Sequence, residues 1–163
     1  MEIISIKKHH YQDIANIYKQ GIETGIATFE TSVPTWETWN DSKLLHSRFI
    51  AVDNNDVLGW VALSKVSSRC VYEGVAEVSI YIAENHRGKG VGKILMENVI
   101  RESEANGIWT LQSGMFAENE ATIALHKIVG FRIIGYREKI GKLGGVWKDN
   151  VIMERRSKVV GID

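Results

Sequence analysis

The chain has 163 residues, of which 44% are hydrophobic and 25% are charged, so it can bury the core of one globular domain. Its 20 lysines and arginines balance its 20 aspartates and glutamates, which leaves no net positive charge to hold a nucleic acid or an anionic membrane. The single cysteine, Cys70, allows no internal disulfide, and the first residues lack the apolar segment of a signal peptide. We therefore expect a cytoplasmic protein with no nucleic acid and no membrane among its partners.

Hydrophobic periodicity divides the chain into strands, where apolar residues alternate, and helices, where they recur every three or four residues. In the first part of the chain, the expected elements are a strand at 2–7, a helix over 14–22, an extended segment at 26–31 and a helix capped by Thr35. A hairpin of strands at 49–52 and 57–63 follows, and then a strand at 75–82, a helix at 91–105 and a strand at 109–115. The last expected elements are a helix from Asn119 to Gly130 and strands at 131–140 and 146–153. This interleaving predicts an α/β arrangement with mixed strand directions. We expect one domain at residues 1–155 and a polar tail at 156–163.

The most informative segment is the strand at 75–82 followed by a glycine-rich turn at 86–92 (HRGKGVG) that opens a helix. Glycines let the backbone approach a ligand, and a helix N-terminus adds unpaired N–H groups, so this turn is suited to a phosphate. The Rossmann and P-loop patterns both fail, because Lys93 and Ile94 stand where those motifs need glycine and serine or threonine. What remains is Arg-x-x-Gly-x-Gly, formed by Arg87, Gly90 and Gly92.

This pattern resembles the acetyl-CoA signature of the GCN5-related N-acetyltransferases (GNAT), and the resemblance extends over nearly the whole chain. It implies a mixed, mostly antiparallel sheet of about seven strands with a splayed central parallel pair, flanked by about four helices. In that fold the strand before the turn receives pantetheine, the turn holds the pyrophosphate of acetyl-CoA, and an asparagine on the next helix contacts the cofactor. The matching positions are Ile80, Tyr81, Ile82, Arg87, Gly88, Lys89, Gly90, Val91, Gly92, Lys93 and Asn119.

Four strings narrow the resemblance to phosphinothricin acetyltransferases and related amino-acid N-acyltransferases. They are TFET at 28–31, Arg69 with Tyr72 ahead of AEVSIY at 76–81, NEATIALHKIVG at 119–130, and GVWKD at 145–149. Lys148 departs from the pattern, because its place is often occupied by histidine. The resemblance implies a homodimer that acetylates the α-amine of a small amino acid or an analogue such as phosphinothricin, methionine sulfoximine or methionine sulfone.

Acetyl transfer to an amine needs a base, a stabilised oxyanion and a proton for the leaving thiolate. Strand alternation places Glu77 on one face with Ser79 and Tyr81, and we predict that Glu77 is the general base. The backbone N–H of Ile80 is the expected oxyanion donor. His126 falls beside the apolar stripe of its helix, which predicts that it faces the cofactor and either gives a proton or positions the substrate. Tyr81 is a rival acid, and a packed tyrosine or a solvated histidine is the alternative to both roles.

The substrate-binding residues come from two loops. The guanidinium of Arg69, beside Tyr72, is suited to bind an amino-acid carboxylate. Phe29 and Thr31 resemble the wall of the family's substrate pocket. The histidines lack partners at metal-ligand spacing, so no metal is expected. Two other functions stay open: a protein or peptide N-terminal acetyltransferase with an open groove, and a non-catalytic CoA-binding regulatory module.

Overall fold

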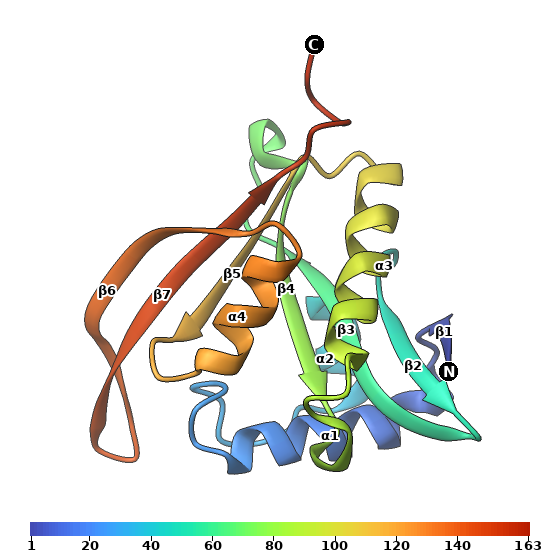
Figure 1. Cartoon of the computed structure of the whole chain (residues 1–163), viewed down its shortest axis with the longest axis vertical. Helices are drawn as coiled ribbons and strands as arrows, with labels where there is room; N and C mark the ends of the chain where they lie inside the picture. The colour runs from blue at the N-terminus through green and yellow to red at the C-terminus, as the bar shows by residue number, and fades with distance from the viewer.

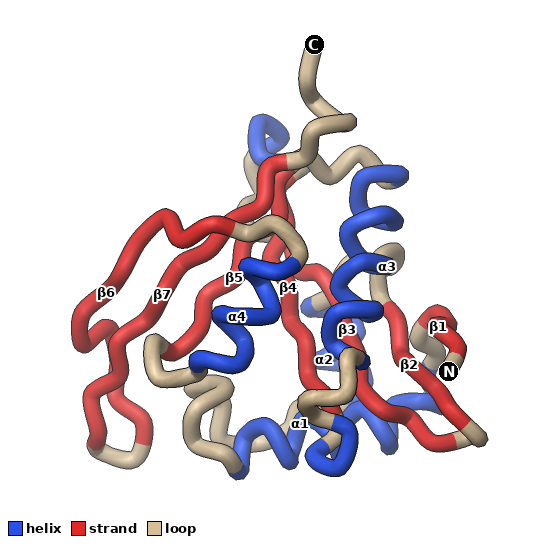
Figure 2. Tube along the Cα trace, in the orientation of Figure 1, coloured by secondary structure: helices blue, strands red, loops and turns tan.

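A single seven-stranded sheet with helices on both faces forms the protein, as the computed structural model of all 163 residues shows (Figures 1 and 2). The strands are β1 (Glu2–Ser5), β2 (Phe49–Asp53), β3 (Asp56–Lys65), β4 (Val75–Ile82), β5 (Thr110–Phe116), β6 (Arg132–Leu143) and β7 (Val146–Arg156). The helices are α1 (Tyr11–Glu23), α2 (Trp36–Ser42), α3 (Val91–Ala105) and α4 (Glu120–Ile128), with single 3-10 turns at Lys8–His10, Cys70–Tyr72 and Glu84–His86.

The strands follow the order β1-β2-β3-β4-β5-β7-β6, and every neighbouring pair is antiparallel except β4 with β5. The expected mixed sheet with a central parallel pair is therefore confirmed. The segment at 26–31, predicted to be extended, joins no strand. Strands β6 and β7 run further than their alternation predicts, because an irregularity between Arg137 and Gly141 interrupts the pattern without ending the pairing.

The parallel pair β4 and β5 holds together at one end only. Its paired residues run from Val75 with Thr110 to Glu77 with Gln112. Beyond this point β4 continues to Ile82 and β5 to Phe116, but the two strands no longer pair with each other. The two strands diverge below this point in Figure 1. This splay leaves one backbone edge of β4 open beside the glycine-rich turn.

Two apolar clusters cover the two faces of the sheet. On one face α3 packs through Leu95 and Met96 against β4 residues that include Val78. On the other face α1 and α2 pack against β3, where Trp39 meets Trp60 with ring centroids 5.5 Å apart. Alternation along β4 therefore places its odd-numbered side chains, Glu77 among them, on the α1 and α2 side, as predicted.

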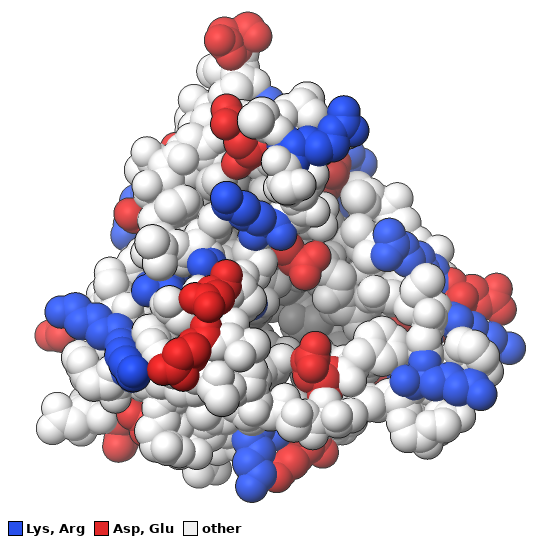
Figure 3. All heavy atoms as spheres, turned by 180° about the vertical axis from the view of Figure 1, so that it is seen from behind, with Lys and Arg blue, Asp and Glu red and all other residues white.

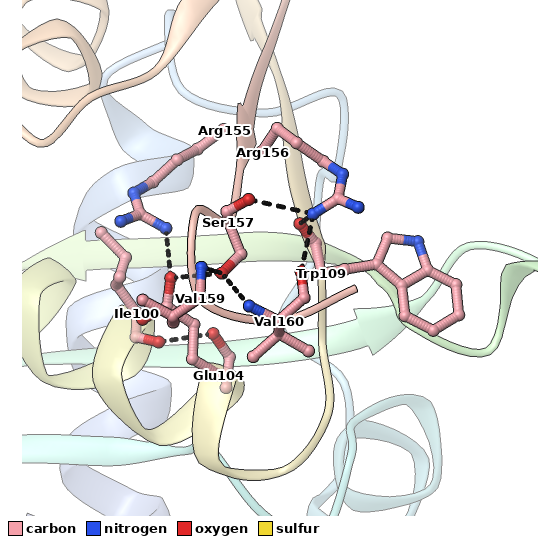
Figure 4. Close-up of polar contacts among 9 residues, drawn as sticks. Ile100, Glu104, Trp109, Arg155, Arg156, Ser157, Val159 and Val160 are labelled. Carbon is pink, nitrogen blue, oxygen red and sulfur yellow. Dashed lines mark hydrogen bonds and ion pairs between the residues drawn. The ribbon is translucent and has the colours of Figure 1, made fainter. Parts of the chain in front are cut away.

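The last residues of the chain are anchored to the fold (Figure 4). The carboxylate of Glu104, near the end of α3, accepts hydrogen bonds from Arg155 Nη1 at 2.9 Å and from Ser157 Oγ at 2.8 Å. Arg156 Nη1 donates to the carbonyl oxygen of Val160 at 2.8 Å. The segment predicted to be a polar tail thus packs, as far as Gly161, against Trp109 just before β5. No helix in the structure is long and apolar enough to cross a bilayer, and no three side chains of the metal-binding types cluster together.

Candidate active site

The glycine-rich turn presents a row of backbone N–H groups without acceptors. Gly88 and Gly90 have φ angles of 71° and 84°, a left-handed conformation that favours glycine, and Gly90 is the N-cap of α3. No side chain caps this helix, and the N–H groups of residues 88–93 donate to no acceptor within the protein. Free donors at a helix N-terminus attract anions, so the turn has the geometry expected of a phosphate site.

Gly92 has a different role from the glycines of the turn itself. A Cβ atom at this position would lie 3.0 Å from Leu125 Cδ2 and 3.7 Å from Ile82 Cγ1. Its absence therefore lets α3 pack closely against α4 and the end of β4. Asn119 caps α4 through its Oδ1 atom, which accepts a hydrogen bond from the Thr122 N–H at 3.3 Å.

The open edge of β4 carries unpaired backbone groups. Ala83, just beyond β4, donates its N–H to Leu58 at 2.8 Å, so the odd-numbered residues of β4 bond to β3. In an antiparallel pair these groups alternate, and the N–H and C=O of Ile80 and Ile82 therefore point into the gap beside β5. The carbonyl of Ile82 accepts from Arg87 Nε at 3.2 Å. The Ile80 N–H is free in the position proposed for an oxyanion donor.

Glu77 stands where β4 and β5 part. Its side chain is exposed, and its Oε2 atom accepts a hydrogen bond from Gln112 Nε2 at 3.3 Å across the last paired residues. An exposed carboxylate with only one weak partner keeps acceptor sites free for a substrate amine.

Tyr81 shares this face but is tightly packed. Its ring stacks on Trp60 at 5.0 Å and meets Tyr18 at 4.8 Å, and α1 passes so close that a Cβ on Gly21 would lie 2.5 Å from the ring. Burial raises the pKa of Tyr81 far above its ordinary value. The phenol therefore stays protonated at neutral pH.

His126 lies in the interior, so the prediction that it lies beside the buried side of its helix, and not on it, is wrong. It is 1% exposed and is the only buried residue of α4. Its Nδ1 atom lies 2.7 Å from the Thr122 carbonyl, its ring meets Phe131 edge-on at 4.9 Å, and its Nε2 atom has no partner. Burial lowers the pKa of this imidazole, which keeps it neutral.

The error in α4 has a physical origin. Ile128, an apolar residue that helical spacing predicts to be on the inner side of α4, is 66% exposed in the structure. The chain turns at Gly130, where φ is 93°, and brings Phe131 against the opposite side of the helix. Hydrophobic periodicity assigns a histidine to the surface, and it does not predict that the turn at Gly130 brings Phe131 against His126.

Arg69 and Tyr72 lie together before β4, as the sequence predicts. The guanidinium of Arg69 lies 5.5 Å from the centre of the Tyr72 ring, and both side chains are exposed. No residue of the chain accepts a hydrogen bond from this guanidinium. It is therefore free to bind a carboxylate near the start of β4.

Phe29 and Thr31 have different surroundings. Phe29 packs edge-on against Phe116 at 4.6 Å, and a Cβ on Gly141 would lie 2.9 Å from its ring. It thereby links the connection between α1 and α2 to the ends of β5 and β6. Thr31 is exposed and its hydroxyl makes no hydrogen bond in the structure, whereas the Phe29 ring is packed on one side and remains 38% exposed.

A cavity of about 340 Å³ opens on the α1 and α2 side of the sheet, and the molecule is hollowed near the centre of its rear face (Figure 3). Ser79 and Tyr81 of β4 line the cavity together with Lys43, which the sequence did not indicate. Lys43 Nζ donates to Ser64 Oγ and Ser79 Oγ, both at 3.1 Å. Nothing in the sequence distinguishes this lysine from a solvated one, because strand pairing alone brings the two serines to it.

Known proteins are similar to this chain in both sequence and fold. The profile of the acetyltransferase (GNAT) family matches residues 12–131. The L-methionine sulfoximine/L-methionine sulfone acetyltransferase of Pseudomonas aeruginosa is 28% identical over 121 residues, covering 72% of this chain and 70% of that protein. The phosphinothricin N-acetyltransferase of Alcaligenes faecalis is 30% identical over 149 residues, covering 87% and 75%.

A solved structure agrees with these relatives. The phosphinothricin acetyltransferase of Sinorhizobium meliloti, a GNAT superfamily protein crystallised with acetyl-CoA, superposes with a TM-score of 0.87 at 25% identity and covers 99% of this chain and 96% of its own. The family profile spans more than half of the sequence and includes β4, the glycine-rich turn and α3. The chain therefore belongs to the acetyltransferase (GNAT) family.

Proposed function

We propose that the protein transfers the acetyl group of acetyl-CoA to the α-amine of a small amino acid or analogue, by direct transfer with Glu77 as general base. Family membership makes the chain an N-acetyltransferase with acetyl-CoA as cosubstrate. Relatives named for phosphinothricin, methionine sulfoximine and methionine sulfone support the substrate class. The observation that carries the proposal is the row of free N–H groups at residues 88–93, at the open end of the splay.

The cofactor fits this row and the edge of β4. The pyrophosphate is bound by the N-terminus of α3, and Arg87 and Lys89 add positive charge beside it. The pantetheine arm carries two amides and runs along the unpaired edge at residues 80–82, as an added strand would. Asn119, at the start of α4, lies on the far side of the gap from this edge. The Ile80 N–H then receives the thioester carbonyl.

Glu77 removes the proton that blocks attack. The α-amine of a free amino acid is almost fully protonated at pH 7, because even the less basic α-amine of a peptide has a pKa near ~8, so the carboxylate has to take up this proton before attack. The freed nitrogen attacks the thioester carbon, the C–N bond forms, and the C–S bond breaks to release the CoA thiolate. Of the two candidate proton donors for this thiolate, Tyr81 lines the cavity, whereas His126 is enclosed. Tyr81 is therefore the proposed proton donor to the thiolate.

The substrate lies between the two predicted loops. Arg69 binds its carboxylate, Tyr72 supports the guanidinium, and Phe29 excludes water from the other side. In this proposal Thr31 lies at the rim of the substrate pocket.

A homodimer is part of the same proposal. The β6–β7 hairpin carries apolar side chains that no helix covers, and such exposed groups favour association. They are Ile133, Ile134, Tyr136, Ile140, Val146 and Trp147, each between 45% and 60% exposed. A mass of twice 18.3 kDa by light scattering is the expected result, and a monomer at micromolar concentration contradicts it.

Thiol release from acetyl-CoA tests the function. Wild-type protein is screened against phosphinothricin, methionine sulfoximine, methionine sulfone and ordinary amino acids, and at least one is expected to be acetylated. Glu77→Gln should lower kcat by about 100-fold or more while the Kd for acetyl-CoA stays unchanged. Glu73→Gln, which removes an exposed carboxylate from the loop before β4, should behave as wild type. Thiol release with peptides but with no amino acid would contradict the proposed substrate class, and full activity in Glu77→Gln would contradict the base.

A further inference from the structure

A partly buried cation without an ion-pair partner lines the cavity on the α1 and α2 side. Lys43 directly follows α2, and its Nζ atom donates to two serine hydroxyls and takes part in none of the ion pairs of the structure. Burial lowers the pKa of this ammonium, and the charge of Glu77 partly offsets that effect. A charge withdrawn from water is stabilised when an anion comes within reach. The position of Lys43 therefore favours an anionic ligand.

The strand register relates Lys43 to the proposed reaction site. Ser64 pairs directly with Glu77, and Ser79 follows two residues later on the same face of β4. Two residues of strand span about 7 Å, which is comparable to the distance from the α-amine to the end group of an extended glutamate-like amino acid. Arg69 lies beyond Glu77 in the opposite direction, before the start of β4.

This arrangement orients an amino acid along β4. With its carboxylate at Arg69 and its amine at Glu77, as in the proposed function, a bound amino acid would extend its side chain past Ser79 toward the cavity. The lining there is rich in hydroxyl groups, from Tyr18, Ser32 and Tyr81 among others, and Glu30 is its only acidic residue. Lys43 is the only cationic residue in that lining, so it is the group that an acidic side chain would meet.

We propose that Lys43 determines specificity by binding the anionic end group, a carboxylate or phosphinate, of the substrate side chain. This inference rests on the proposed function and adds a preference: glutamate-like acceptors react better than acceptors with a neutral end group. Ser64 and Ser79 hold the ammonium in place, and its third N–H is directed to the ligand.

The test compares two acceptors that differ in the charge of the end group, phosphinothricin and methionine sulfone. Lys43→Met keeps the length of the side chain and removes its charge, and it should lower the ratio of kcat/KM for phosphinothricin over methionine sulfone by about tenfold or more, mainly through KM. Lys43→Arg should retain most of the ratio. Lys65→Met removes an exposed lysine from the end of β3 and should leave it unchanged.

Two results would overturn the inference: a ratio that Lys43→Met does not change, and an equal loss for both acceptors, which would assign Lys43 to the shared carboxylate. Lys43→Gln is measured in parallel, and a thermal melt of each variant shows that the protein compared is folded. Wild type that releases no thiol with any amino acid would end the proposed function instead. In that case calorimetry with phosphinothricin alone tests the role of Lys43. Binding about tenfold weaker in Lys43→Met than in wild type supports the inference. Equal binding in the two proteins, or no binding to either, contradicts it.

Discussion

The two ends of β4 differ in how many of their hydrogen bonds are made. At the start, β3 and β5 flank the strand, and the N–H groups of Trp109 and Thr110 both donate to the carbonyl of Gly74, at 2.8 and 3.0 Å. At the end, only β3 remains, and the turn that follows leaves its N–H groups free. The paired end contributes stability, and the open end is available to a ligand. The unmade hydrogen bonds at the end of β4 and in the turn that follows it therefore locate the site.

The paired end is also the better packed. A Cβ on Gly74 would lie 2.0 Å from the Trp109 ring, so the indole covers the backbone where β4 begins. The chain end closes over the same region through Glu104 and Ser157 (Figure 4). Changes there should alter stability and leave binding intact, whereas changes at the open end should alter binding.

The largest expected effect is at the turn. Gly90→Val places a β-branched residue at a φ of 84°, which costs about 2 kcal/mol and displaces the first N–H groups of α3. The Kd for acetyl-CoA, measured by calorimetry, should rise about tenfold or more. Gly107→Val is the matched control, because Gly107 has a φ of 79° beyond the other end of α3. It should lose similar stability without losing affinity, and equal affinity losses would contradict the assignment of the turn.

The next effect is at the paired end. Glu104→Ala removes a carboxylate that is 18% exposed and leaves Arg155 and Ser157 without their acceptor, so the free energy of unfolding should fall by about 2 kcal/mol. Urea denaturation measures this loss. Glu23→Ala breaks an ion pair with Lys19 whose side chains are 61% and 69% exposed, and it should cost less than about 0.5 kcal/mol. Turnover per folded molecule should stay at the wild-type level in both variants.

The smallest effect concerns His126, which is enclosed beside the open end. Its folded-state pKa is lowered, so below its ordinary value of 6.5 the unfolded chain binds a proton that the folded chain resists. The free energy of unfolding should therefore fall as the pH drops through this region. Between pH 7 and pH 5.5, the free energy of unfolding measured by urea denaturation should fall further for wild type than for His126→Leu. The same loss in both proteins would show that His126 does not titrate in this way.

Sequence reasoning succeeded where one local pattern determines the structure. The alternation of 75–82 and the glycines at 88, 90 and 92 predict β4, the turn and the start of α3, which together form the open end. It failed where long-range contacts decide. The burial of His126 depends on where Phe131 packs, and the position of Lys43 depends on the pairing of β3 with β4. Both residues are polar, and a pattern that scores hydrophobicity assigns them to the surface.

The open end of β4 is tested most directly by amide hydrogen exchange, followed residue by residue with and without acetyl-CoA. Without the cofactor, the amides of residues 88–93 should exchange quickly, because they donate to no acceptor. At saturating acetyl-CoA these amides and that of Ile80 should become protected, while those of Val75–Glu77 exchange slowly in both states. Unchanged exchange at 88–93 in protein shown by calorimetry to be saturated would contradict binding of the pyrophosphate by this turn.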